Sequence, residues 1–583
     1  MKKKLMIVFA IFVVVFLLIE PAIANSQTLW KHDYTSTLKN LDDPHEEILN
    51  GRRFLWKAPS LPPLDDGYPV LFVLHGATQY AESWFWSGKG GLKGSFVWGK
   101  RQTNFVENAL EKGFFIIAPD SIRPYKFGPK AWDSSTMNFN ESKDLPFIQD
   151  ILDWLLNPPV PINSSRIFCI GFSSGAFMTS RIAYFFGSQF RATAVHSGGF
   201  ADRGHLTVLQ HSFDYNSKHD ISEDHPPTLI IHGSKDLLVP IELGVRYYKE
   251  LQNAGIRVHI LLNSNGRHIW QSIFNKQILE WFLYGSHAPE QPIQPLAGPG
   301  GSNYSHNEVI ESSYGRGAKK YWIFEPAEPK PETAPLVVFN HGWSAMHPRF
   351  YRAWIDHIVK RGNIVVYPRY QRGFVIGFKF FSSNAVNAVK NAIKELENGG
   401  HVAPDLEKFA ITGHSLGGGI TANMAARAEE EGLPIPKAIM PVQPALVYDK
   451  NADLSKTSNE TLMLVIVGED DTVVGNQSGR TIFLNTEQIP LFKKDFVIQV
   501  TDNYGYPGIV ADHFAPTCET NNSFLSVDAM DYYCTWKLFD ALTDYAFYGI
   551  NAEYCLGNTP KQRYMGEWSD GSLVKELIVT DTP

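Results

Sequence analysis

The stretch Arg166-Ile167-Phe168-Cys169-Ile170-Gly171-Phe172-Ser173-Ser174-Gly175 decides the fold. A mainly apolar run leads into a Gly-x-Ser-x-Gly sequence, which is typical of a buried strand that turns sharply into a helix. The glycines permit the strained turn, and the serine hydroxyl is lifted out of the end of the strand. The same pattern recurs as Phe409-Ala410-Ile411-Thr412-Gly413-His414-Ser415-Leu416-Gly417. Two such turns, each in a suitable setting, are hard to attribute to chance.

Apolar runs of strand length alternate with helical periodicity around each turn. Continuous apolar strands between helices imply a mostly parallel sheet covered on both faces. We therefore predict two tandem α/β domains of the same fold, residues 25–288 and 303–583, joined by the Pro/Gly-rich linker 289–302. The predicted strands are 70–76, 114–120, 166–170, 228–233 and 258–262 in the first half and 335–342, 363–368, 409–412, 462–468 and 495–500 in the second.

A serine hydroxyl needs a base to take its proton, and that base is normally a histidine oriented by a carboxylate. In the first half, Asp236 follows the strand 228–233, and His268 lies in a glycine-containing loop after the next strand. The order Ser, Asp, His is the one that follows a nucleophile turn of this kind. We predict Ser173 as nucleophile, His268 as general base and acid, and Asp236 as the orienting carboxylate.

The second half supplies the same three parts. Ser415 is the predicted nucleophile, and His513 is the only histidine after the candidate carboxylates. Aligning Gly468 with Gly233 puts Asp471 opposite Asp236, although a slip of one residue would select Asp470 instead. The predicted second triad is Ser415, His513 and Asp471, with Asp470 as the alternative carboxylate.

Each site also needs N–H donors for the oxyanion of a tetrahedral intermediate. One donor is expected to be the residue after each serine, Ser174 or Leu416. The other is expected in the loop after the first parallel strand of each half, at Ala77 or Thr78 and at Trp343 or Ser344. His75 and His341, in the same loops, are expected to brace the backbone rather than act as bases.

As a set, these parts resemble the α/β-hydrolase superfamily. Leu74-His75-Gly76-Ala77-Thr78-Gln79 and the motif at Ser173 resemble the group of feruloyl esterases, acetyl xylan esterases and polyhydroxybutyrate depolymerases, although Ala176 stands where that group often has glycine. Phe339-Asn340-His341-Gly342-Trp343 and the motif at Ser415 resemble chlorophyllase, dienelactone hydrolase and polyester-hydrolase relatives. The resemblance implies hydrolysis of carboxylic esters, either small molecules, polysaccharide-linked esters or polyesters, through an acyl-enzyme and without cofactor or metal.

Two alternatives use the same residues. The triad alone specifies acyl transfer, so a peptidase or an acyltransferase remains open. No propeller-like repeat of the sort that accompanies prolyl-oligopeptidase relatives precedes the first domain. One domain could also be active while the other serves as a binding scaffold.

The N-terminus predicts export. Lys2, Lys3 and Lys4 precede the apolar run Leu5 to Ile19 and an Ala-x-Ala site, which predicts a signal peptide over residues 1–24. The run is shorter than the roughly 20 residues that span a bilayer, so we expect a secreted or periplasmic protein with no stable membrane insertion after cleavage. An uncleaved N-terminal anchor is the alternative. Export makes a disulfide among Cys518, Cys534 and Cys555 plausible.

The formal net charge of -7 gives no indication of a basic surface that would bind nucleic acid.

Overall fold

The computed structural model describes residues 43–63, 65–85, 99–122, 130–134, 138–200, 221–373, 380–446, 452–518 and 527–583. The predicted signal peptide lies outside these residues. Within Pro44–Pro583, which forms one compact unit, the two halves of the chain build one sheet each. No helix in the described ranges is both long enough and apolar enough to cross a membrane.

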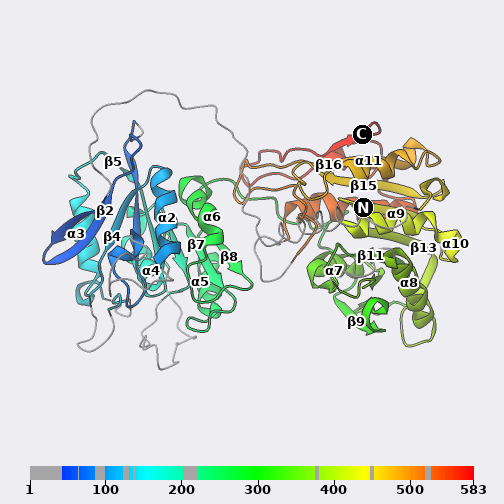
Figure 1. The fold of residues 1–583 in the computed structure, drawn as a ribbon, viewed down its shortest axis with the longest axis horizontal. Coiled ribbons are helices and arrows are strands. Elements are labelled where there is room, and N and C mark those ends of the chain that lie inside the picture. The colour runs from blue at the N-terminus through cyan, green and yellow to red at the C-terminus, as the bar shows by residue number, and fades with distance from the viewer. Residues whose placement is uncertain are drawn as a thin grey trace, which may run out of the picture. The chain divides into compact units, whose positions relative to one another are not determined.

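The first half builds an eight-stranded sheet in the order β1-β2-β4-β3-β5-β6-β7-β8, drawn in blue to green in Figure 1. Strand β2 pairs antiparallel with β1 and β4, and all other neighbours pair parallel. The strands are β1 His45–Leu49, β2 Arg52–Lys57, β3 Tyr68–Leu74, β4 Phe115–Pro119, β5 Ile162–Phe172, β6 Ala192–His196, β7 Thr228–Gly233 and β8 Val258–Asn263.

The second half builds a nine-stranded sheet in the order β9-β10-β12-β11-β13-β14-β15-β16-β17. Its first eight strands repeat the order of the first sheet, and β17 adds an antiparallel edge. The strands are β9 Glu308–Tyr314, β10 Tyr321–Ala327, β11 Thr333–Asn340, β12 Ile364–Pro368, β13 Ala403–His414, β14 Ala438–Val442, β15 Leu462–Gly468, β16 Lys494–Gln499 and β17 Ile578–Thr580.

Helices cover both faces of each sheet, which confirms the predicted fold class. In β11, Val337 and Phe339 pack with α7 and α12, whereas Leu336 and Val338 pack with α8, α9 and α11. This alternation buries every second side chain on opposite faces. The helices are α2 Gly99–Glu111, α3 Leu145–Trp154, α4 Ser174–Phe186, α5 Ile241–Asn253, α6 Asn275–Glu280, α7 Arg352–Lys360, α8 Phe381–Glu397, α9 Leu416–Ala426, α10 Ala428–Glu431, α11 Gln477–Leu484, α12 Lys537–Tyr548 and α13 Pro560–Arg563.

The segment 289–302 contains no helix or strand, but it is packed against the second half. Gly300 N–H donates to Asp540 Oδ2 at 2.7 Å, and Gln291 Nε2 donates to the Pro507 carbonyl at 3.1 Å. Asp540 also accepts from His357 Nε2 at 2.9 Å. The segment therefore has a fixed path along the second half.

The four cysteines, Cys169, Cys518, Cys534 and Cys555, are buried free thiols. The disulfide that export would permit among the last three is absent from the structure. Cys534 Sγ instead accepts from Gln499 Nε2 at 3.5 Å, and Cys555 Sγ faces the Ala552 carbonyl at 3.4 Å. These thiols act as small core residues, as buried cysteines commonly do.

Two candidate active sites

Both serines occupy the same strained turn between a strand and a helix. Ser173 has φ 55° and ψ −116° between β5 and α4, and Ser415 has φ 56° and ψ −122° between β13 and α9. Positive φ is costly for a residue with a Cβ, and such strain recurs at functional sites. The Ser173 N–H donates to the His196 carbonyl and the Ser415 N–H to the Val442 carbonyl, each at 3.0 Å, so the neighbouring strand holds each turn.

The last glycine of each motif lies directly against the backbone of the first parallel strand. A Cβ on Gly417 would sit 2.1 Å from the Asn340 carbonyl oxygen, and one on Gly175 would sit 2.2 Å from the Leu74 carbonyl oxygen. These oxygens belong to strand ends that cannot move away cheaply. Only glycine therefore allows the helix to start this close to the sheet.

We predict that Gly417→Ala destabilises the second half by about 1–3 kcal/mol, since the added methyl overpacks against backbone. Thermal or urea unfolding measures this loss. Gly373→Ala is the matched control, because a Cβ there meets nothing within 4 Å. Equal stability of the two variants would contradict the packing described for the turn.

Ser173, His268 and Asp236 form one hydrogen-bonded row in the first half. His268 Nε2 lies 2.9 Å from Ser173 Oγ, and His268 Nδ1 lies 2.7 Å from Asp236 Oδ2. An ionised carboxylate can only accept, so the Nδ1 nitrogen carries the proton and Nε2 is left to accept from the serine hydroxyl. The structure thus brings together the three residues that the sequence singled out.

Backbone groups fix the carboxylate of Asp236. Its Oδ1 accepts from Leu238 N–H at 3.0 Å and from Val239 N–H at 2.9 Å. With one oxygen held by the loop, the other is aimed at His268. The following side chain points outward, because Leu237 is 93% exposed.

Ser415, His513 and Asp471 repeat this geometry in the second half. His513 Nε2 lies 3.0 Å from Ser415 Oγ, and His513 Nδ1 lies 2.8 Å from Asp471 Oδ2. Asp471 Oδ1 accepts from Val473 N–H at 2.9 Å and from Val474 N–H at 3.0 Å. The two carboxylates are therefore held by loops of the same design.

The structure distinguishes between Asp470 and Asp471, the two adjacent candidates for the carboxylate of the second triad. Asp470 Oδ2 accepts from the Thr501 hydroxyl at 2.6 Å and so faces away from His513. Although burial raises the pKa of Asp471, the hydrogen bond from His513 and the N–H groups of Val473 and Val474 outweigh it and lower that pKa. Asp471 is accordingly held ionised beside the histidine.

The loops that were expected to supply oxyanion donors each contain a residue with positive φ at the corresponding position. Thr78 and Ser344 have φ 65° and 66°. Thr78 N–H donates to the Lys130 carbonyl at 2.7 Å, and Ser344 N–H donates to Gln371 Oε1 at 2.9 Å. Both N–H groups are thus used to pin the loop. The preceding residues, Ala77 and Trp343, become the stronger donor candidates, while Ser174 and Leu416 open their helices, where an N–H has no intrahelical acceptor.

His75 braces the first of these loops. Its Nε2 accepts from Ser121 N–H at 3.2 Å, so its Nδ1 carries the proton that faces the Gly76 carbonyl at 2.8 Å. Burial lowers the pKa of His75 to about 4, which keeps the ring neutral. His341 Nδ1 lies 2.6 Å from the Gly342 carbonyl oxygen, while its Nε2 lies 2.7 Å from the Arg369 carbonyl oxygen. Trp132 is buried and donates its indole N–H to the His75 carbonyl at 2.8 Å.

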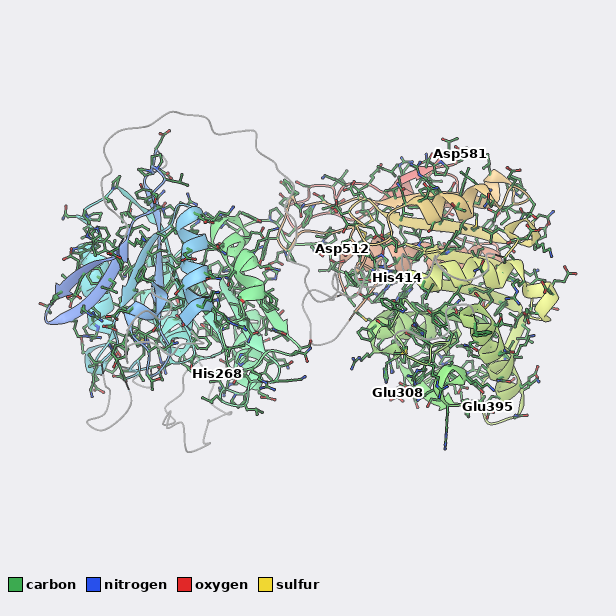
Figure 2. The ribbon with its side chains drawn as sticks, viewed as in Figure 1. His268, Glu308, Glu395, His414, Asp512 and Asp581 are labelled. Carbon is green, nitrogen blue, oxygen red and sulfur yellow. The ribbon has the colours of Figure 1, made fainter. Side chains whose placement is uncertain are left out.

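The residue before each serine was not singled out by the sequence and differs between the sites. The Phe172 ring packs 5.2 Å from the His268 ring, between centroids, whereas the His414 ring packs 4.7 Å from the His513 ring. Figure 2 labels His268 in the first half and His414 in the second. The sequence signal that could have identified this residue is its place in the Gly-x-Ser-x-Gly motif, since the variable position before the serine lies beside the nucleophile.

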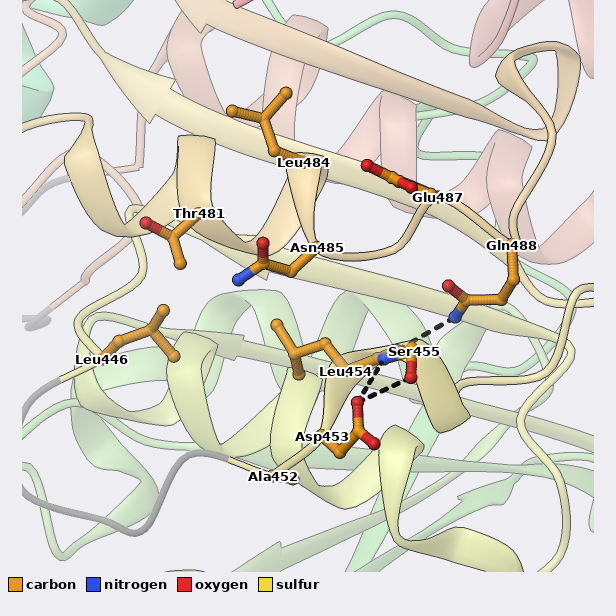
Figure 3. A pocket seen from close by; sticks show the side chains of 10 residues that line it. All are labelled: Leu446, Ala452, Asp453, Leu454, Ser455, Thr481, Leu484, Asn485, Glu487 and Gln488. Carbon is orange, nitrogen blue, oxygen red and sulfur yellow. Dashed lines mark hydrogen bonds between the residues drawn. The ribbon is translucent and has the colours of Figure 1, made fainter.

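A pocket of about 510 Å³ in the second half lies apart from both triads. It opens between α11 and the short helix Leu454–Lys456, where Gln488 Nε2 donates to the Leu454 carbonyl at 2.9 Å (Figure 3). Its lining residues are Leu446, Ala452, Asp453, Leu454, Ser455, Thr481, Leu484, Asn485, Glu487 and Gln488.

Family models match each half separately. The model of the prolyl oligopeptidase family matches residues 104–284, which contain Ser173, Asp236 and His268. The chlorophyllase model matches residues 300–456, which contain Ser415 and agree with the resemblance noted for that half.

Relatives include both a depolymerase and peptidases. The chain is 28% identical over 237 residues to a poly(3-hydroxyoctanoate) depolymerase of Pseudomonas fluorescens, which covers 40% of this chain and 80% of that protein. It is 23% identical over 269 residues to a probable dipeptidyl-peptidase 5 of Aspergillus niger, covering 40% of this chain and only 32% of that protein. A crystal structure of a thermostable esterase aligns with a TM-score of 0.31 at 20% identity, over 42% of this chain and 63% of that one. The family models and the relatives, taken with the two mostly parallel sheets, identify the chain as a serine-type hydrolase of the α/β-hydrolase superfamily.

Proposed function

We propose that the protein is a secreted carboxylic-ester hydrolase with two active sites, one in each of two α/β-hydrolase domains, residues 25–288 and 303–583. The observation that carries this proposal is the repeated geometry. In each half, a histidine lies within 3.0 Å of the motif serine and within 2.8 Å of an aspartate. Two intact Ser–His–Asp arrangements favour an active site in each domain over one active domain and one binding scaffold.

The chemistry follows from the direction of the hydrogen bonds. His268 takes the Ser173 proton at Nε2 as the oxygen attacks the ester carbonyl, and Asp236 stabilises the imidazolium that forms. The histidine then protonates the leaving alcohol, and a water activated at the same nitrogen hydrolyses the acyl-serine. In the second site, Ser415, His513 and Asp471 take these roles.

The oxyanion would be bound by two backbone N–H groups in each site. In the first site these are Ser174 and Ala77, and in the second Leu416 and Trp343. Thr78 and Ser344 support the loops instead, because their N–H groups already donate to Lys130 and Gln371. Loss of one oxyanion donor typically costs about 3 kcal/mol of transition-state stabilisation.

Ester cleavage is favoured over peptide cleavage by the likeness to the depolymerase, of which the matched region covers 80%. Leu237 and Leu238, which are 93% and 56% exposed directly after Asp236, add an apolar rim suited to an alkyl ester or a polyester. Peptidase activity of the first half is the second candidate, because the prolyl oligopeptidase model matches residues 104–284 and the chain also has dipeptidyl-peptidase relatives.

A matched substrate panel tests this choice. We predict that p-nitrophenyl esters of increasing acyl length are cleaved with kcat/KM at least 100-fold above aminoacyl and dipeptidyl p-nitroanilides. The panel should be run on Ser173→Ala and Ser415→Ala separately, so that each site is scored alone. Faster cleavage of the anilides by the site that retains Ser173 would overturn the ester assignment for the first half.

A further inference from the structure

The second site contains a buried hydrogen-bonded chain that the triad does not include. Gly342 N–H donates to the Tyr351 hydroxyl at 3.0 Å, and that hydroxyl lies 2.8 Å from His414 Nδ1. His414 Nε2 lies 3.1 Å from Gln443 Oε1. Gln443 Nε2 donates to the Asp512 carbonyl at 2.6 Å. Tyr351, His414 and Gln443 are at most 2% exposed.

The donors along this chain can run in only one direction. A backbone carbonyl oxygen can only accept, so the Gln443 amide nitrogen donates to Asp512 and the Gln443 side-chain oxygen faces His414 Nε2. His414 Nε2 must therefore carry the proton and donate to that oxygen. In the neutral ring, Nδ1 then accepts from the Tyr351 hydroxyl, whose oxygen accepts from Gly342 N–H. Burial, followed by the neighbouring His513, lowers the pKa of His414 to about 3, so the ring stays in this neutral form.

The two ends of this hydrogen-bonded series lie in two loops, and the reaction needs both loops to be correctly placed relative to each other. Gly342 precedes Trp343 in the oxyanion loop, and Asp512 precedes His513, the proposed base. Between them, the His414 ring packs 4.7 Å from the His513 ring, between centroids. A shift at either loop would leave buried polar groups unpaired, which is costly.

Within the described residues of the first half, the corresponding hydrogen bonds run to other partners. Gly76 N–H donates to Gln79 Oε1 at 2.7 Å, a partner only three residues further along the same loop. Phe172 stands where the second site has His414, and a phenyl ring cannot pass on a hydrogen bond. The loop that follows His268 is held separately, since Gln271 N–H donates to His196 Nε2 at 2.8 Å. The connection is therefore a property of the second site and not of the turn itself.

We propose that Tyr351, His414 and Gln443 are positioning residues of the second site, which lock its oxyanion loop to the loop of His513. This inference rests on the proposed function of Ser415. It adds that the second site's two working parts move as one unit, whereas those of the first site are held independently.

The test uses the full chain carrying Ser173→Ala, so that turnover reports the second site. Adding Tyr351→Phe or His414→Phe should lower kcat about 10- to 100-fold with KM within about twofold, because misplaced groups hinder the reaction more than binding. The double variant should lose no more than the worse single one, since both break the same chain. Tyr247→Phe is the control, because it removes a buried Tyr–His contact of 2.8 Å to His225 in the other half.

Hydrogen exchange gives a readout that does not depend on activity. Tyr351→Phe should speed amide exchange in the peptide that carries Gly342 and also in the one that carries His513. If the Ser173→Ala protein has no turnover, the proposed function fails at Ser415. The exchange experiment still decides whether the hydrogen bonds through Tyr351 and His414 connect the two loops. Unchanged exchange at His513, or kcat within twofold in both single variants, would overturn the proposal.

Discussion

Replacing both Ser173 and Ser415 by alanine should reduce ester turnover by at least about 10⁴-fold, because it removes the two hydroxyls that lie against His268 and His513. Each single variant keeps the activity of the other site. The panel of acyl chains should therefore divide into substrates lost with Ser173 and substrates lost with Ser415. Initial rates at saturating ester, with protein concentration set by absorbance, measure the effect.

Ser180→Ala is the matched control for these serine variants. Ser180 is a buried serine of α4, the helix that follows Ser173, and its hydroxyl donates to the carbonyls of Phe177 at 2.8 Å and Gly199 at 2.9 Å. Its removal should leave kcat unchanged. Substantial turnover by the double variant would mean that the chemistry resides elsewhere in the chain. Loss of all activity with one serine would make the other domain auxiliary for those esters.

Asp471→Asn, made with Ser173→Ala, should lower kcat about 10⁴-fold, whereas Asp470→Asn should lower it less than threefold. The amide at position 471 can donate to His513 Nδ1 and so favours the tautomer that cannot accept the Ser415 proton. Asp470 contacts Thr501 instead of the histidine. The adjacent pair thus provides its own control, with the same change of charge at neighbouring positions.

The corresponding change in the first half is Asp236→Asn, tested with Ser415→Ala. The same loss is expected there, because Asp236 and Asp471 have the same two backbone donors and the same histidine contact. Circular dichroism and thermal unfolding check that the variants fold. A larger loss from Asp470→Asn than from Asp471→Asn would show that the second triad is assigned to the wrong carboxylate.

The parallel cores of both sheets could be predicted because their strands are buried on both faces. Tyr68–Leu74 is buried along its whole length and forms a continuous apolar run. The edge strand His45–Leu49 has no fully buried residue, so it gives no such run and was missed. Ala192–His196 was missed for another reason, since a short stretch rich in alanine does not stand out as a strand.

The candidate triads could be predicted in outline because their order along the chain is tied to the strands. The sequence could not show which way each candidate carboxylate points. Asp470 and Asp471 are adjacent residues of the same type, and only the fold turns one toward Thr501 and the other toward His513. The link from Tyr351 through His414 to Gln443 joins three separate elements, so no local pattern predicts it.

The most direct test of two active sites is to label the chain with a fluorophosphonate and map the modified residues by mass spectrometry. The geometry predicts two labels per chain, on Ser173 and Ser415, each lost when its histidine, His268 or His513, is replaced by alanine. Buried serines such as Ser180 should remain unmodified. Labelling of neither motif serine, or labels that persist without these histidines, would contradict the account.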